Sequence, residues 1–381
     1  LKAFASTPLG KELCKELVPS TDINEIEHNL LETSDALSMV LKKGLLSFSG
    51  VRDIRSSLMR LDVGSVLGID EILAVSSLLN VTLRVKSYTR KENLGSSVHN
   101  DEEESNVTNS LTSYFDALEP LSNVNSEMKR CIISNDEIAD DASTTLRQIR
   151  KSIKNTNNKV HEQLNGIVNS SRTMLQDALI TMRNGRYCLP VKAEYRSSFK
   201  GMIHDQSATG STLFIEPMAI VKLNNELREL SLKEQDEIER ILAELSNMIG
   251  EHAEELKINL EVLTKLDFIF AKANLSKQMR ASVPDFNQDG IVDIKRGRHP
   301  LIDSKQVVPI DIRLGDEFDL LVITGPNTGG KTVSLKTVGL FTLMGQAGLH
   351  IPAFDHSKLS VFDDVFADIG DEQSIEQSLS T

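Results

Sequence analysis

The residues of this sequence that most clearly indicate chemistry lie between Gly325 and Thr332. They read Gly-Pro-Asn-Thr-Gly-Gly-Lys-Thr and match the phosphate-loop (Walker A) pattern G-x-x-x-x-G-K-[ST]. An apolar run at 319–324 precedes them and a helical pattern at 333–344 follows. Glycines let backbone N–H groups converge on phosphate oxygens, with the positive end of the helix dipole behind them. The segment therefore predicts a strand, a nucleotide-binding loop and a helix.

Two side chains of this loop have expected roles. Lys331 is placed to reach the β- and γ-phosphates, and the Thr332 hydroxyl is placed to ligate Mg²⁺. The loop alone does not distinguish ATP from GTP. A P-loop enzyme also needs a later strand that ends in acidic residues, and we expect that strand beyond Thr381, so no catalytic residue is assigned. Asp363 and Asp364 imitate such an end but follow the helix too closely, and we interpret them as a solvated strand or turn.

The composition indicates a multidomain protein without membrane contact. A chain of 381 residues exceeds what one hydrophobic core usually supports, and 40% of its residues are hydrophobic and 25% charged. No stretch resembles a membrane span or a signal segment, so we expect a cytoplasmic protein. The three cysteines are far apart, which gives neither a disulfide framework nor a zinc spacing. The net charge of −13 argues against coating nucleic acid over the whole surface, but it leaves room for a local basic site.

Helical patterns occupy most of the sequence before the phosphate loop. We expect a helical core domain at 1–135, with a helix whose N-terminus is marked by a capping box at Asp22 and Glu25 and whose end is marked by Gly44. Long apolar stripes at helical spacing then predict an ascending helix within 136–183 and a descending one within 220–282. These two lever helices are predicted to pair antiparallel.

Strand-like periodicity and glycine turns separate the two stripes and predict a small β tip at 184–219. Five basic residues stand against one acid, Glu194, near its start. They are Arg183, Arg186, Lys192, Arg196 and Lys200. On an acidic protein this local reversal predicts contact with a phosphate backbone, for which we select Arg186, Lys192, Arg196 and Lys200. A chance fluctuation of surface charge is the alternative.

Several of these segments together resemble the MutS ATPases. The loop 324–331, the upstream Gly-Arg-His-Pro at 297–300 and the downstream Asp-Ile-Gly-Asp-Glu-Gln-Ser at 368–374 are similar to that family in kind and order. The tip sequences at 184–192 and 204–217 resemble the second bacterial MutS branch. The resemblance covers nearly the whole chain.

The resemblance implies a fold and a site. The fold would be multidomain, with a mostly α-helical core, long antiparallel lever helices and a small β clamp tip, followed at 283–381 by part of an α/β P-loop ATPase domain of the ABC type. The cofactors implied are ATP and Mg²⁺, and His299 would lie beside the nucleotide, although before Pro300 it can equally close a turn. The implied nucleotide-binding set is Gly325, Pro326, Asn327, Thr328, Gly329, Gly330, Lys331, Thr332 and His299.

The resemblance also implies partners. Two subunits of a homodimer would share the nucleotides, with Ser380 and Thr381 in the signature segment that completes the partner's site. We expect this chain to be a fragment that hydrolyses ATP poorly, with the acidic strand and a C-terminal Smr nuclease domain beyond it. The full-length protein would be an ATPase that clamps nucleic acid. Its target would be branched DNA, which implies suppression of homologous recombination, or ribosomal RNA on collided ribosomes, which implies ribosome splitting.

Mismatch recognition is not expected. Phe214-Ile215-Glu216 matches the Phe-x-Glu pattern of mismatch-repair proteins but lies in the tip, and we interpret the match as coincidence. Two other classes of function remain open. A small-molecule P-loop kinase would use the same loop but would not need two long helices. An architectural coiled-coil protein with an inert P-loop would not respond to ATP.

Overall fold

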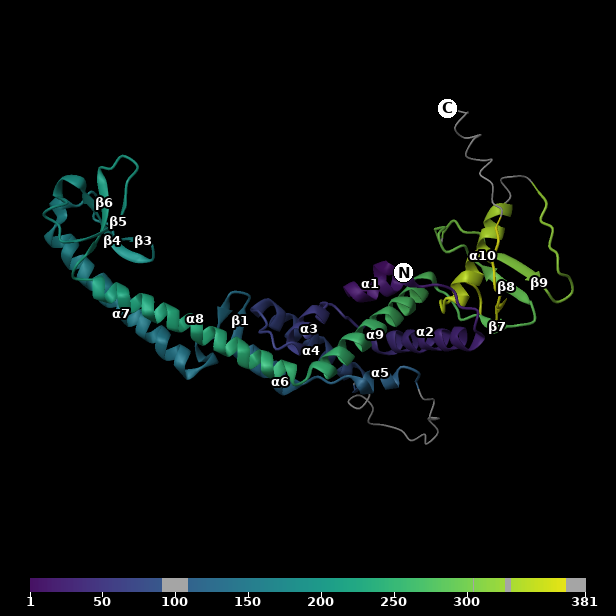
Figure 1. Ribbon diagram of the computed structural model, residues 1–381. Coiled ribbons are helices and arrows are strands. Elements are labelled where there is room, and N and C mark those ends of the chain that lie inside the picture. The colour runs from purple at the N-terminus through teal and green to yellow at the C-terminus, as the bar shows by residue number, and fades with distance from the viewer. Residues whose placement is uncertain (91–108, 304, 326–329, 368–381) are drawn as a thin grey trace, which may run out of the picture. The chain divides into compact units, whose positions relative to one another are not determined.

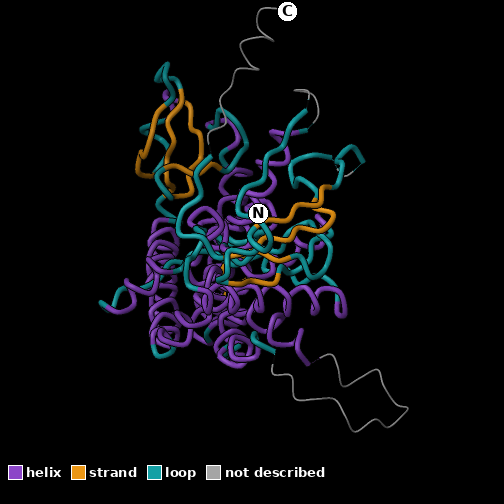
Figure 2. The backbone as a smooth tube through the Cα atoms, turned by 90° about the vertical axis from the view of Figure 1, so that its right-hand side faces the viewer, coloured by secondary structure: helices purple, strands orange, loops and turns teal. Residues whose placement is uncertain are grey.

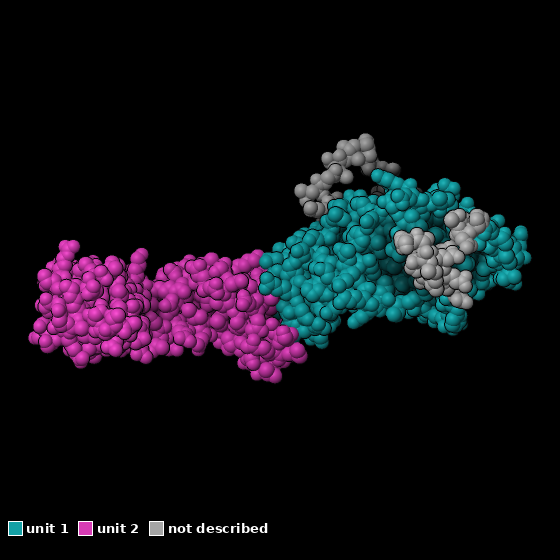
Figure 3. Space-filling model, turned by 90° about the horizontal axis from the view of Figure 1, so that it is seen from above, with its two compact units in different colours: residues 1–55, 77–122, 254–381 teal, residues 56–76, 123–253 magenta. Residues whose placement is uncertain are grey.

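The structure is a computed structural model that describes residues 1–90, 109–303, 305–325 and 330–367 (Figure 1). Helices predominate, and the strands within the described residues form three small sheets (Figure 2). Backbone contacts divide the chain into two compact units (Figure 3). Unit 1 comprises residues 1–55, 77–122 and 254–381, and unit 2 comprises residues 56–76 and 123–253. A helical, multidomain protein with small sheets was predicted, and this is what the structure shows.

The helical part of unit 1 has an aromatic cluster in its core. Its helices are α1 (Pro8–Glu16), α2 (Ile23–Lys43), the second half of α4 (Ile69–Arg90), α5 (Thr112–Ala117) and α9 (Ala253–Met279). The ring of Phe270 on α9 meets Phe48 and Tyr88 edge to face, with centroids 5.7 and 6.2 Å apart. Asp22 caps α2 by accepting from the backbone N–H of Asn24, and α2 ends at Gly44, as the sequence predicts.

Unit 1 also contains a four-stranded sheet covered by one helix. Its strands are β7 (Asp285–Asn287), β8 (Val292–Gly297), β9 (Ile310–Leu314) and β10 (Lys358–Ser360), in the order β7-β10-β8-β9. Strand β10 runs parallel to β7 and antiparallel to β8. Helix α10 (Lys331–Gln346) buries Phe341 and Met344 against Ile294 and Leu359 of this sheet.

The strand predicted at 319–324 is absent from the described structure, so that prediction was wrong. Leu320 and Val322 have exposed fractions of 78 and 72%, and none of the strands that the structure describes pairs with this run. An apolar, β-rich sequence becomes a strand only when a neighbouring strand satisfies its backbone groups and covers its side chains. The run has the composition of a buried strand but finds no partner among the described residues.

Two long helices, α7 (Thr144–Ser170) and α8 (Val221–Gly250), lie side by side in unit 2 (Figure 1). At about 1.5 Å per residue they are roughly 40 and 45 Å long. Arg150 of α7 donates to Glu234 of α8, and Thr156 of α7 donates to Glu226 of α8. The residue numbers of the bonded pairs rise along α7 and fall along α8. The two helices are therefore antiparallel, as predicted.

The bounds of these helices differ from the expected ranges. Helix α7 begins at Thr144, capped by Ser143, because the residues before it form a β-hairpin that ends at Ile138 and then a 3-10 turn at Asp140–Ala142. The descending stripe is interrupted at Gly250, where α8 ends, and it resumes in α9. Before α7, unit 2 also contains α3 (Arg55–Asp62), the first half of α4, α6 (Ser122–Cys131), β1 (Ile132–Ser134), β2 (Glu137–Ile138) and a 3-10 turn (Asp140–Ala142).

An antiparallel sheet lies at one end of the α7–α8 pair. Its strands are β3 (Thr181–Arg183), β4 (Arg186–Lys192), β5 (Gly201–Gln206) and β6 (Thr212–Pro217), in the order β3-β4-β6-β5. Asn184 and Gly185 both have positive φ, 52° and 74°, and form the two-residue turn between β3 and β4. Leu189 and Ile215 of the sheet share a core with Val160 and Leu164 of α7. The tip is therefore packed onto the lever helix.

Candidate nucleotide site and nucleic-acid interface

The described part of the predicted phosphate loop contains two glycines with positive φ. Gly330 adopts a left-handed conformation with φ 79° and is the N-cap of α10, and Gly325 has φ 145°. Only glycine adopts both conformations readily. The Lys331 ammonium donates to the carbonyl of Gly325 at 2.6 Å, so it reaches back across the loop. Predicted residues Pro326, Asn327, Thr328 and Gly329 lie outside the described residues.

Thr332 lies in the first turn of α10 and is half-buried. The first N–H groups of a helix have no partner within the helix and attract anions. Mg²⁺ usually keeps several waters and takes one or two protein oxygens together with phosphate oxygens. A single hydroxyl at this position fits that pattern. In the part of the chain that the structure describes, no cluster of three or more His, Cys, Asp or Glu side chains is arranged to hold a metal by itself.

His299 and its neighbour Arg298 make hydrogen bonds in different places, His299 within its own turn and Arg298 at the end of α9. The backbone N–H of Leu301 donates to Nδ1 of His299 at 3.3 Å, so His299 does close a turn. Burial and the nearby Lys336 of α10 lower the pKa of His299, so the ring is neutral near pH 7. Arg298 instead donates to the carbonyls of Met279 and Arg280 at the end of α9, at 3.2 and 2.6 Å.

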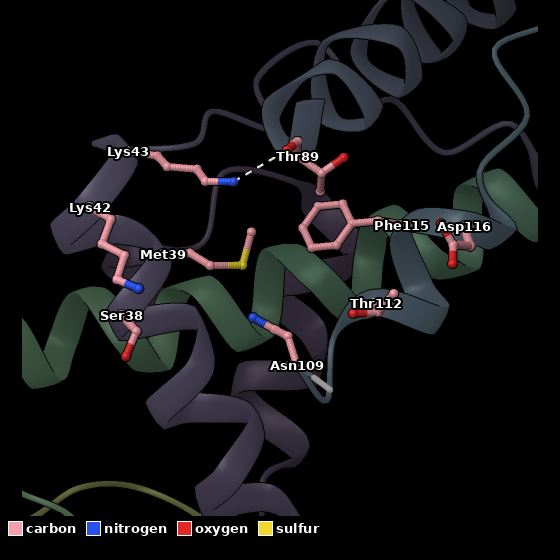
Figure 4. A pocket seen from close by; sticks show the side chains of 9 residues that line it. All are labelled: Ser38, Met39, Lys42, Lys43, Thr89, Asn109, Thr112, Phe115 and Asp116. Carbon is pink, nitrogen blue, oxygen red and sulfur yellow. Dashed lines mark hydrogen bonds between the residues drawn. The ribbon is translucent and has the colours of Figure 1, made fainter. Parts of the chain in front are cut away.

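The remaining candidate residues of this region lie in a loop or outside the described residues. Asp363 and Asp364 are exposed in a loop after β10, consistent with a solvated turn. Ser380 and Thr381 lie outside the described residues. A pocket of about 280 Å³ elsewhere in unit 1 is lined by side chains of α2, α4 and α5, among them Met39, Lys43 and Phe115 (Figure 4). It borders Asn109, next to the undescribed segment 91–108, and we assign it no role.

The basic residues predicted for the tip divide into two groups. Arg196 and Lys200 are exposed, and half-buried Lys192 donates to the carbonyl of Thr173 at 3.2 Å. The Arg186 side chain is only 17% exposed, and its guanidinium donates to Glu216 and Asn225 at 2.8 and 2.6 Å. Because these bonds hold Arg186 inside the fold, we withdraw it from the set proposed to contact phosphate.

Glu216 has a structural role in the tip that the sequence did not indicate. Its carboxylate is fully buried and meets Arg186, Nε2 of His204 at 2.6 Å and the side-chain amide of Asn224 at 2.7 Å. Phe214 lies beneath Arg183, whose guanidinium carbon is 4.0 Å from the ring centroid. Neither residue is presented to a ligand, which supports the interpretation that Phe-x-Glu is a coincidence here. Arg172, exposed in a short turn outside the predicted tip, was missed as a candidate contact.

Comparison with known proteins decides the family. Over its full length the chain is 61% identical to the endonuclease MutS2 of Lachnoclostridium phytofermentans and 57% identical to that of Agathobacter rectalis. The chain belongs to the MutS2 family. The endonuclease MutS2 of Acetivibrio thermocellus is 48% identical, again over the whole chain. Residues 321–381 also match the family description MutS domain V.

This MutS2-family chain spans about half the length of the curated relatives it matches, 47–48% in these three cases. The match to MutS domain V begins just before the phosphate loop and includes α10 and β10. Among the helices that the structure describes, none is both long enough and apolar enough to pass through a lipid bilayer.

Proposed function

We propose that this chain is the nucleotide-controlled clamp region of a MutS2-type protein. Residues 283–381 would form the first part of a P-loop ATPase domain that binds ATP with Mg²⁺. The helices within 136–183 and 220–282 would act as levers, and the tip would contact nucleic acid through Arg196, Lys200 and Lys192. The observation that carries the proposal is the exposure of Arg196 and Lys200 in the connection between β4 and β5, on a tip that packs against two paired helices.

Both ends of this proposal rest on ordinary physical chemistry. Backbone N–H groups, a lysine and a helix N-terminus together favour a nucleotide phosphate at α10. Exposed cations on an acidic protein favour a polyanion at the tip, where binding releases counterions. Contacts of this kind carry no base sequence information. The tip therefore suits either branched double-stranded DNA or ribosomal RNA, and both have to be tested.

The full-length protein would work as a homodimer. Two ATPase domains would enclose two nucleotides, with the segment that ends at Ser380 and Thr381 completing the partner's site. ATP hydrolysis would then change the separation of the domains and the hold of the tips. The relatives bear the name endonuclease. We extend that activity to the full-length protein and assign it to none of the residues described.

The test measures binding of the full-length protein to a four-way DNA junction and to purified ribosomes. Affinity is recorded over a range of salt concentrations, with and without ATP and a non-hydrolysable analogue. We expect a steep salt dependence and a nucleotide-dependent change in affinity for one of the two targets. If nucleotide leaves both affinities unchanged, the architectural alternative is correct. Transfer of phosphate from ATP to a small acceptor would instead support the kinase alternative.

A further inference from the structure

The end of α9 in unit 1 is bound to the segment that follows the phosphate-loop helix. Ser282 and Ile351 exchange two backbone hydrogen bonds of 2.9 and 3.0 Å. Six residues earlier, in the last two turns of α9, Oγ of Ser276 lies 2.8 Å from Nδ1 of His350. Arg298, next to His299, donates to the carbonyl of Arg280. Two chain segments that flank the predicted nucleotide site therefore hold the same helix end.

His350 joins α9 to a second helix of the core. Its other ring nitrogen, Nε2, lies 3.0 Å from Oγ of Ser34 on α2. The hydroxyl of Ser34 donates to the carbonyl of Leu30 at 2.9 Å, whereas Oγ of Ser276 lies 3.4 Å from the carbonyl of Ala281. The shorter bond commits the proton of Ser34, so this geometry favours Ser34 as the acceptor from Nε2–H. Nδ1 is then the unprotonated nitrogen and accepts from the hydroxyl of Ser276. One neutral imidazole thus connects α2, α9 and the chain after α10.

Burial keeps the ring in this state. His350 is 3% exposed. Burial, together with the nearby ammonium of Lys272, lowers the pKa of His350 to about 4. A neutral ring with one donor and one acceptor matches one serine that accepts and one that donates.

The end of α10 is seated on α2 with little freedom to shift alone. Gln346 exchanges two hydrogen bonds with Ser20, of 3.0 and 2.8 Å. Thr33 of α2 donates to the carbonyl of Gly348 at 2.9 Å. A Cβ at Gly348 would lie 2.5 Å from the Cβ of Asn29. Because densely packed interfaces do not deform smoothly, the end of α10 and α2 either move together or switch to another packing arrangement.

We propose that His350 is a positioning residue that transmits movement of the phosphate-loop helix to α2 and α9. This inference rests on the proposed function, because it assumes that nucleotide at Lys331 displaces α10. Helix α10 carries Lys331 at its first residue and ends at Gln346, four residues before His350. Helix α9, to which His350 is bonded, follows α8 after two residues of chain. Movement at the phosphates therefore has a route along α10 and the chain to His350, and through the hydrogen bonds of His350 into α2 and α9.

The test removes the two serine partners and leaves the imidazole in place. Ser34→Ala and Ser276→Ala are made in the full-length protein, with Ser34→Thr and Ser276→Thr as conservative variants that keep the hydroxyl. Ser76→Ala is the matched control, because it deletes a buried 2.7 Å hydrogen bond to Asn125 in unit 2. Each protein is assayed for ATP affinity, and for affinity to the four-way junction and to ribosomes with and without the ATP analogue.

We expect both alanine variants to bind each ligand alone within about twofold of wild type. The ratio of affinities with and without analogue should fall roughly three- to tenfold. The threonine variants and Ser76→Ala should keep that ratio, which separates transmission from a general loss of stability. If the wild type shows the ratio and both alanine variants retain it in full, the inference is overturned while the proposed function stands. If the analogue leaves the affinities of the wild type unchanged, so that the ratio is one, the proposed function fails, and this inference with it.

A second measurement needs no variant. Amide hydrogen exchange in wild-type protein reports the opening of residues 276–282 and 346–351 directly. We expect addition of the analogue to change exchange in both segments together. Exchange that changes around Lys331 while both segments stay unaltered would show that nucleotide binds without moving this junction, and would overturn the inference.

Discussion

The guanidinium of Arg186 lies 2.8 Å from the fully buried carboxylate of Glu216. The same carboxylate meets Nε2 of His204 on β5 and the amide of Asn224 in the first turn of α8. The other amino group of the Arg186 guanidinium donates to the side-chain carbonyl of Asn225, one residue further along α8. A buried charge network thus attaches three strands of the tip to the start of a lever helix. The orientation of the tip sheet on α8 is fixed by this network as well as by the apolar core.

Arg186→Ala should destabilise the tip strongly. Removing one partner of a buried ion pair leaves the other charge uncompensated, which typically costs about 3–5 kcal/mol. Urea unfolding followed by circular dichroism measures the loss. Arg196→Ala, at an exposed position, should change the free energy of unfolding by less than about 0.5 kcal/mol. Equal effects of the two variants would contradict the structural role given to Arg186.

Charge reversal of exposed tip residues should act on binding and leave folding intact. Arg196→Glu with Lys200→Glu should weaken affinity for nucleic acid and reduce its salt dependence, by about 0.9 in the logarithmic slope for each duplex phosphate that the protein no longer neutralises. Filter binding or fluorescence anisotropy at several salt concentrations gives the slope. Lys2→Glu with Lys15→Glu changes the net charge equally at exposed positions of unit 1. If this control lowers the slope as much, the tip does not bind the nucleic acid.

Lys331→Ala should weaken ATP binding about tenfold to hundredfold, because a hydrogen bond to a charged group contributes roughly 1.5–3 kcal/mol. The affinity is measured by titration calorimetry on the full-length protein. Lys358→Ala on β10 removes an exposed lysine from the same unit and should bind ATP normally. Unchanged ATP affinity in Lys331→Ala would contradict the phosphate-loop assignment.

The comparison of Arg186 with Arg196 also shows where sequence reasoning reached its limit. Counting charges along the chain set five basic residues against one acid, but two of the five pair with acids that come later in the sequence. Asp205 lies 3.2 Å from Arg183, and Glu216 meets Arg186. Neighbours across a sheet are separated by turns, so a count over a short window cannot see them. The turn at Asn184-Gly185, by contrast, is a local signal and was predictable.

Periodicity predicted the long helices better than it predicted the strand before the phosphate loop. Helices α7 and α8 satisfy their backbone groups internally, so an apolar stripe is enough to locate them. The bounds shifted where local chemistry intervened, with Ser143 as a cap before α7. The run at 319–324 can become a strand only beside another strand, and its own sequence does not show whether one is present. The network around His350 depends on residues from three distant segments, and no spacing in the sequence indicates it.

Gly348→Ala should cost more than a positive φ alone explains. Gly348 and Gly64 have nearly equal φ values, 72° and 73°, but only Gly348 has a neighbour within reach of an added Cβ. Gly64→Ala should therefore lose about 1 kcal/mol from backbone strain. Gly348→Ala should lose that amount plus roughly 1–3 kcal/mol from the collision with Asn29. Equal midpoints in urea unfolding of the two variants would show that α2 can retreat from the loop.

The stability of the protein should depend on pH through His350. Its folded pKa is about 4, below the ordinary value of 6.5. Below pH 6.5 the unfolded chain takes up a proton that the folded protein refuses. The lowered pKa of His350 therefore contributes fully to the free energy of unfolding above pH 6.5. This contribution, on the order of 3 kcal/mol in total, is lost as the pH falls toward 4. His350→Gln should lower stability at pH 7 but flatten the decline between about pH 7 and 5, measured by urea unfolding at each pH. His299, whose pKa is also lowered, contributes with the same sign in both proteins. A decline equally steep in His350→Gln would show that the buried imidazole is protonated in the folded protein.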